Sequence, residues 1–243
     1  MKLLKKIAEI IFPNQCLSCK ILIGQEGLFC SQCWQKLQFI TEPKCKICSQ
    51  PFDYKIDDNL SCPRCLSFKP YFDKTIVALR YNLVIRKIIK NFKYYDNSYL
   101  AKKLAPLLFS KIALETNNFD IIAAVPLHKK RLRIRKFNQS ILLAKEISNK
   151  FKKPLYYNLI FRIKNTANQA SLKRKERERN LKNAFLFNDA YIDLIKNKKI
   201  LLVDDVMTTG ATLDNCAKVL KKAGAKEVIV AVVAKRVFGQ VNF

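Results

Sequence analysis

Residues 200–213 read Ile200-Leu-Leu-Val-Asp-Asp-Val-Met-Thr-Thr-Gly-Ala-Thr-Leu213, and this stretch decides the fold. Ile200–Val203 is a short apolar run, which predicts a strand buried on both faces of a parallel sheet. Asp204 and Asp205 follow at the carboxyl end of that strand, where open α/β sheets bind their ligands. The small, hydroxyl-rich turn at 208–212 leads into an apolar-periodic helix, and such a helix N-terminus favours an anion. The stretch therefore predicts a phosphate site beside two carboxylates.

Two carboxylates beside a phosphate site indicate a ligand with more than a phosphate, because like charges repel. Sugar hydroxyls, or a metal ion between the two groups, would suit the carboxylates. The stretch resembles the phosphoribosyl-pyrophosphate (PRPP) signature of the type I phosphoribosyltransferases. This resemblance implies that Asp204 and Asp205 are the catalytic pair on the ribose hydroxyls and that Mg²⁺ accompanies PRPP. It also implies that the 5′-phosphate is bound by Thr208, Thr209, Gly210, Ala211 and Thr212.

Eight of the nine cysteines form four Cys-x-x-Cys pairs within the first 65 residues. One pair offers two thiolates to an ion, and two pairs complete a tetrahedral zinc site. Because four sulfurs close the coordination, we expect about two structural zinc ions; nothing directs export, which disfavours disulfides. Pairing in sequence order is the default, and interleaved pairing stays open. The predicted ligands are Cys16, Cys19, Cys30, Cys33, Cys45, Cys48, Cys62 and Cys65.

Apolar spacing predicts the remaining elements. Strands are expected at 72–81 and 120–126, and helices at 84–95, 98–114 and 140–152. This alternation predicts an α/β fold with a Rossmann-like open parallel sheet, similar to type I phosphoribosyltransferases. We expect a short amphipathic helix and a double zinc ribbon in residues 1–68, and the phosphoribosyltransferase-like domain in residues 69–243.

Two stretches concentrate positive charge. Residues 128–136, read as a strand-to-helix loop, hold seven basic-type side chains: His128, Lys129, Lys130, Arg131, Arg133, Arg135 and Lys136. Such crowding is unfavourable unless an anion meets it, so we expect pyrophosphate contacts from Lys129, Lys130 and Arg135; the alternative is a solvated charge run. The second stretch, 162–183, predicts either a mobile lid over the site or a helix that tracks a nucleic-acid backbone.

The chain carries 46 Lys and Arg against 19 Asp and Glu, a formal charge of +27. This balance favours a polyanionic partner such as nucleic acid, although the codon bias of an AT-rich genome also raises the lysine content. The two basic stretches predict that this partner is single-stranded DNA. No run reaches the roughly 18 apolar residues that a membrane span needs. The first 13 residues lack a signal-peptide pattern, because Lys5, Lys6 and Glu9 break the apolar run. We therefore expect a cytoplasmic protein without stable membrane insertion.

Nearly the whole chain resembles the ComF family of competence proteins. The matching residues are the four cysteine pairs, Phe-Cys-Ser-Gln-Cys-Trp at 29–34, Phe-Lys-Tyr at 92–94, Val-Pro-Leu-His at 125–128, Phe-Asn-Gln at 137–139, Gln169, Leu172, Arg179-Asn180, Ala184-Phe185 and Ala-Gly-Ala at 223–225. The family usually has Arg-Gly-Phe-Asn-Gln where this chain has Lys136 in place of glycine. That lysine either adds a phosphate contact or shows that the backbone there need not be glycine-like.

Two functions follow as hypotheses. The intact signature favours a phosphoribosyltransferase that transfers the sugar from PRPP, or a related sugar phosphate, to a nitrogen acceptor that the sequence does not name. The family resemblance implies a role in DNA uptake and natural transformation, with a competence helicase as a possible partner. In that second hypothesis the chain is a non-catalytic factor that binds single-stranded DNA and keeps only a sugar-phosphate site.

Overall fold

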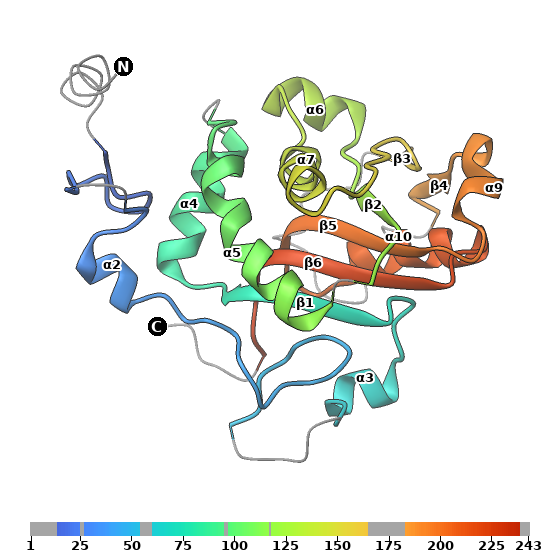
Figure 1. Cartoon of the computed structure of the whole chain (residues 1–243), viewed down its shortest axis with the longest axis horizontal. Helices are drawn as coiled ribbons and strands as arrows, with labels where there is room; N and C mark the ends of the chain where they lie inside the picture. The colour runs from blue at the N-terminus through green and yellow to red at the C-terminus, as the bar shows by residue number, and fades with distance from the viewer. Residues whose placement is uncertain are drawn as a thin grey trace.

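The structure is a computed structural model that describes residues 14–24, 27–53, 60–94, 97–116, 118–164 and 183–238. A four-stranded parallel sheet in the order β1-β6-β5-β2 forms its centre (Figure 1). The strands are β1 (Lys74–Arg80), β6 (Glu227–Lys235), β5 (Lys199–Met207) and β2 (Ile121–Ala124). The predicted α/β fold is therefore confirmed. The helix expected at the N-terminus and residues 165–182 of the second basic stretch lie outside the described residues.

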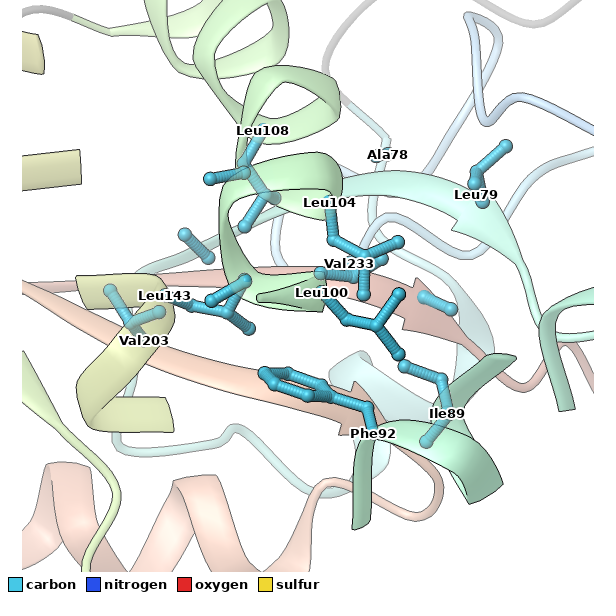
Figure 2. Close-up of a cluster of buried hydrophobic side chains, with 14 of the residues drawn as sticks. Ala78, Leu79, Ile89, Phe92, Leu100, Leu104, Leu108, Leu143, Val203 and Val233 are labelled. Atoms are coloured by element: carbon cyan, nitrogen blue, oxygen red, sulfur yellow. The ribbon is translucent and has the colours of Figure 1, made fainter. Parts of the chain in front are cut away.

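Helices cover both faces of the sheet. On one face lie α4 (Leu83–Tyr94), α5 (Leu100–Glu115) and α7 (Gln139–Phe151), and on the other lies α10 (Ala211–Lys222). Figure 2 shows the first core, in which Leu100 and Leu104 of α5 and Phe92 of α4 pack near Val233 of β6. The apolar side chains repeat at helical spacing because only one side of each helix meets the sheet.

The cysteine-rich segment packs against both cores. Its first half, with α2 (Ser31–Gln35), joins the core under α5, and its second half, with α3 (Pro63–Ser67), joins the core on the α10 side. The connection between the halves runs along the edge strand β1. There Ile40 N–H donates to Ala78 O and Arg80 N–H donates to Gln38 O. This connection satisfies backbone groups that an edge strand otherwise leaves open.

Three features differ from the sequence predictions. β5 continues to Met207, so Asp204 and Asp205 lie within the strand, near its carboxyl end, rather than after it. Residues 129–135 form a helix, α6 (Lys129–Arg135), not a loop, because the His128 side chain caps it by accepting from Lys130 N–H. A small hairpin of β3 (Ile160–Arg162) and β4 (Phe185–Phe187), followed by η1 (Asp189–Tyr191) and α9 (Ile192–Ile195), was not foreseen. Among the described helices, none is long and apolar enough to cross a membrane.

Candidate functional site

The eight paired cysteines form two four-sulfur clusters. One cluster joins the first pair with the second, and the other joins the third with the fourth, so pairing in sequence order is confirmed. Cys19 Sγ and Cys30 Sγ lie 3.6 Å apart, and Cys48 Sγ and Cys62 Sγ lie 3.7 Å apart. Zn–S bonds of about 2.3 Å in a tetrahedron place sulfurs about 3.8 Å apart. Both clusters therefore fit structural zinc.

The second cluster is the more deeply enclosed. All four of its cysteines are buried, whereas Cys19 of the first cluster is exposed. The ammonium group of Lys235, itself fully buried, donates to the Cys48 carbonyl oxygen over 2.6 Å. Four thiolates on one Zn²⁺ carry a net charge of −2, which compensates a buried lysine nearby.

The described residues enclose a cavity of about 1050 Å³ at the carboxyl end of the sheet. Residues from distant parts of the sequence meet there. They are Asp204 and Asp205 of β5, the loop at 208–212, Lys93 and Tyr94 of α4, Arg131 and Arg135 of α6, Gln139 and Ser140 of α7, and Arg162 of β3. One cavity is thus lined by the two carboxylates, by the loop at 208–212 that was predicted to bind a phosphate (the phosphate loop), and by one predicted pyrophosphate contact, Arg135.

Asp204 and Asp205 are held by groups from different elements. Asp204 Oδ1 accepts from Ser140 Oγ at 2.7 Å and from Asp205 N–H at 2.9 Å. Asp205 Oδ2 lies 2.7 Å from Lys93 Nζ in an ion pair. Burial, and then the charge of Asp205, raises the pKa of Asp204 to about 6. Two adjacent carboxylates under this mutual repulsion suit a hydroxyl donor or an oxygen-liganded cation such as Mg²⁺.

The phosphate loop requires its glycine. Gly210 has φ +82°, a left-handed conformation, and a Cβ atom there would lie 2.6 Å from Met207 Cε. Thr209 Oγ1 accepts from Ala211 N–H at 3.4 Å as the chain enters α10. Ala211 and Thr212 belong to the first turn of that twelve-residue helix, so their amides face the anion-favouring end.

Three arginines, Arg131, Arg135 and Arg162, also line the cavity. Arg135 donates to Gln139 Oε1 at 3.3 Å, and its guanidinium lies over the Tyr94 ring. Arg162 is buried, and burial followed by repulsion from Arg131 lowers its pKa to about 10. Lys129 and Lys130, two of the predicted pyrophosphate contacts, are exposed on α6 and do not line the cavity.

The Asn138-Gln139-Ser140 segment ties the site together. Asn138 caps α7 and donates to Val125 O at 3.0 Å, and Gln139 Nε2 donates to Phe92 O at 3.0 Å. Ser140 then reaches Asp204. From the sequence, Lys93, Asn138 and Gln139 were named only as matches to the family, and Ser140 and Arg162 were missed as site residues. An N-capping Asn directly after a basic run was the available signal.

Lys136, which stands where the family usually has glycine, adopts φ +64° at the end of α6. The backbone there is glycine-like, so the alternative that it need not be is wrong. The histidine at 128 and the ninth cysteine, Cys216, both have structural positions. His128 caps α6, and Cys216 is buried on α10, where burial raises the pKa of its thiol well above its ordinary value.

Known proteins resemble both parts of the chain. The double zinc ribbon family model matches residues 7–66, and the phosphoribosyl transferase domain family matches residues 138–240. Competence protein F of Haemophilus influenzae is 32% identical over 230 residues, which cover 90% of this chain and 96% of that protein. The DNA utilization protein YhgH of Escherichia coli K12 is 30% identical over 225 residues, covering 90% and 95%. Competence protein ComFC of Streptococcus pneumoniae is 27% identical over 210 residues, covering 86% and 88%. The chain belongs to the ComF family of competence proteins and carries a double zinc ribbon followed by a phosphoribosyltransferase-type domain.

Proposed function

We propose that this chain binds PRPP, or a related sugar phosphate, together with Mg²⁺, and that it does so as a factor of DNA uptake. One observation carries the proposal: an acidic pair, a glycine-containing phosphate loop and three arginines line the same cavity. A ligand with ribose hydroxyls between two phosphate-bearing ends matches all three. The names of the relatives, competence protein and DNA utilization protein, support the role in DNA uptake and natural transformation.

Each part of the cavity has a distinct task in this proposal. The loop at 208–212 binds the 5′-phosphate, Asp204 and Asp205 hold the ribose hydroxyls, and the arginines neutralise the pyrophosphate. Mg²⁺, when it is bound with the ligand, adds positive charge to the pyrophosphate and so makes it a better leaving group. The field of the carboxylates favours the cationic sugar that develops as pyrophosphate leaves, so the arrangement suits transfer of the sugar to a nitrogen nucleophile.

Arg131→Ala with Arg135→Ala is expected to weaken PRPP binding at least about tenfold, because charge-assisted hydrogen bonds to phosphate are lost. Lys129→Ala with Lys130→Ala removes the same charge from the same helix. If only cavity-lining residues bind pyrophosphate, this second pair changes the affinity little; if the sequence expectation for Lys129 and Lys130 holds, both pairs weaken it. Calorimetry with PRPP and Mg²⁺ measures the affinities.

Pyrophosphate release, measured with a panel of nitrogen bases, tests turnover separately. A parent protein that shows no Mg²⁺-dependent PRPP binding would refute the proposal outright.

Single-stranded DNA is the second candidate ligand, and further basic residues of the cavity favour it. They are Lys36, Arg80, Arg86, Lys90 and Arg236, and Asp204 and Asp205 are the only acidic residues among all the lining residues described. The contacts proposed for the sugar phosphate use none of these five cations. A nucleic-acid backbone is the polyanion that such a basic run suits, and its end would then reach the sugar-phosphate site.

The affinity for single-stranded DNA is expected to fall with salt at a slope of roughly −3 to −4 in log K against log salt, from four to six phosphate contacts at about −0.7 each. Arg86→Glu with Lys90→Glu, both exposed on α4, should flatten the slope by at least about 1.4. Fluorescence anisotropy across a salt series measures it.

Lys145→Glu with Lys150→Glu is the matched control, since both side chains are exposed on α7 outside the cavity lining. An equal change of slope in the two pairs would show that net charge, and not the basic residues of the cavity, governs DNA binding.

A further inference from the structure

An arginine of the second zinc ribbon contacts the phosphate loop directly. Arg64 lies in α3 between two of the cysteines of that cluster, Cys62 and Cys65. Its guanidinium donates to the backbone carbonyl oxygen of Thr209 and stacks on the Phe238 ring, 4.5 Å from the ring centroid. Arg64 does not line the cavity, whereas Thr209 and Gly210 do. Arg64 therefore contacts the loop from outside the cavity.

This contact fixes the orientation of one peptide group. In a trans peptide the carbonyl of Thr209 and the N–H of Gly210 point in opposite directions. With the carbonyl held toward Arg64, the Gly210 N–H points away from Arg64, which itself does not line the cavity. Gly210 has φ +82°, and glycine allows a peptide next to it to rotate at little cost. A loop of this kind needs an outside contact to keep its amide aimed at a phosphate.

The position of Arg64 is itself fixed from several sides. Tyr71 N–H, just after α3, donates to Asp214 Oδ1 in the first turn of α10 at 2.6 Å. Gln50 exchanges hydrogen bonds with the backbone of Phe238, at 3.1 and 3.2 Å, and so holds the ring on which Arg64 stacks. Cys62 and Cys65 bracket Arg64, so a zinc ion bound by them restrains the turn from which its side chain extends.

We propose that Arg64 is a positioning residue for the 5′-phosphate site and that the zinc cluster of Cys45, Cys48, Cys62 and Cys65 acts through it. The inference rests on the proposed function, because it assigns the ribbon a part in the sugar-phosphate site. Integrity of this zinc cluster then sets the affinity for the sugar phosphate. Zinc loss from the second ribbon lowers that affinity by releasing the loop at 208–212, although no cysteine of the ribbon lines the cavity.

Two probes separate the halves of the site. Ribose 5-phosphate needs the loop at 208–212, whereas pyrophosphate with Mg²⁺ needs the arginines of α6 and β3. Arg64→Ala is expected to weaken ribose 5-phosphate about tenfold and to leave pyrophosphate unchanged, since an oriented donor to phosphate is lost. Arg64→Gln keeps a side-chain donor without the charge and should retain most of the affinity. Lys46→Ala is the matched control, because Lys46 is an exposed cation of the same ribbon, next to Cys45.

Calorimetry with both probes on the full chain decides the matter, with zinc content measured for each variant. A selective loss for Arg64→Ala and rescue by glutamine supports the inference. Equal loss of both probes, no loss, or a similar loss in Lys46→Ala overturns it. If Arg64→Ala does not fold, Phe238→Ala replaces it, because it removes the supporting ring from a half-exposed position and predicts the same selective loss. A parent protein that binds neither probe refutes the proposed function, and this inference with it.

Discussion

Asp204→Asn with Asp205→Asn is expected to weaken Mg²⁺-dependent PRPP binding at least a hundredfold, or about 3 kcal/mol, because both charged contacts to the ribose hydroxyls are lost. The fold should survive the change. Asparagine at 204 keeps an oxygen that can accept from Ser140 Oγ and from the backbone amide of residue 205. Asparagine at 205 gives up the ion pair with Lys93.

The pH dependence of stability gives the single variant Asp204→Asn a signature of its own. The pKa of Asp204 is raised from 3.8 to about 6 by burial and by Asp205. An acid whose pKa is higher in the folded state binds its proton more tightly there, so the free energy of unfolding falls as the pH rises from about 4 to about 6. Asp204→Asn removes the titrating carboxyl, and with it this fall in the free energy of unfolding. Above pH 6 the single variant should be more stable than the parent, by about 2 kcal/mol.

The control for the double variant is Asp189→Asn with Asp193→Asn, which removes two exposed carboxylates on η1 and α9. Calorimetry and thermal unfolding at pH 5 and pH 8 measure both signatures. Unchanged PRPP affinity in the Asp204 and Asp205 variant would mean that the acidic pair plays no part in ligand binding.

Local sequence patterns predicted the parts of the site that one segment supplies. The buried strand, its acidic pair and the phosphate loop are continuous in the chain, and the zinc clusters follow from the spacing of the cysteine pairs. Ser140, Lys93 and Arg162 were beyond reach because each comes from a different element. Apolar spacing shows which face of a helix is buried. It does not show which polar side chains near the ends of that helix lie at the carboxyl edge of the sheet.

Arg162 illustrates the limit. Its sequence neighbours are basic, so it was assigned to a solvent-exposed lid or nucleic-acid helix. In the structure it pairs across the hairpin with Phe185, and its side chain is buried. The three-residue strand β3 is too short to give an alternating pattern, and its partner β4 lies more than twenty residues further along the chain.

Loss of the second zinc cluster is expected to destabilise the whole chain, whereas loss of the first is expected to loosen mainly its own ribbon. Cys48→Ser and Cys30→Ser should each lower the zinc content from about two to about one per chain. Cys48→Ser also removes negative charge beside the fully buried Lys235, whose ammonium donates to the Cys48 carbonyl. An uncompensated buried charge costs about 3–5 kcal/mol, which corresponds to a fall of about 10 °C in Tm.

Cys30 is half-buried and its neighbour in the cluster, Cys19, is exposed, so water can solvate what remains of the first site. Cys30→Ser should therefore lower Tm by a smaller amount, and the sheet domain should stay folded. Metal analysis and calorimetric unfolding measure the two effects. Equal losses of Tm would contradict the difference in burial, and a parent protein with quantitatively disulfide-bonded cysteines and no zinc would contradict the ribbon altogether. Because Arg64 lies between two cysteines of the cluster that contains Cys48, the same pair of variants should also differ in ribose 5-phosphate affinity, with the larger loss in Cys48→Ser.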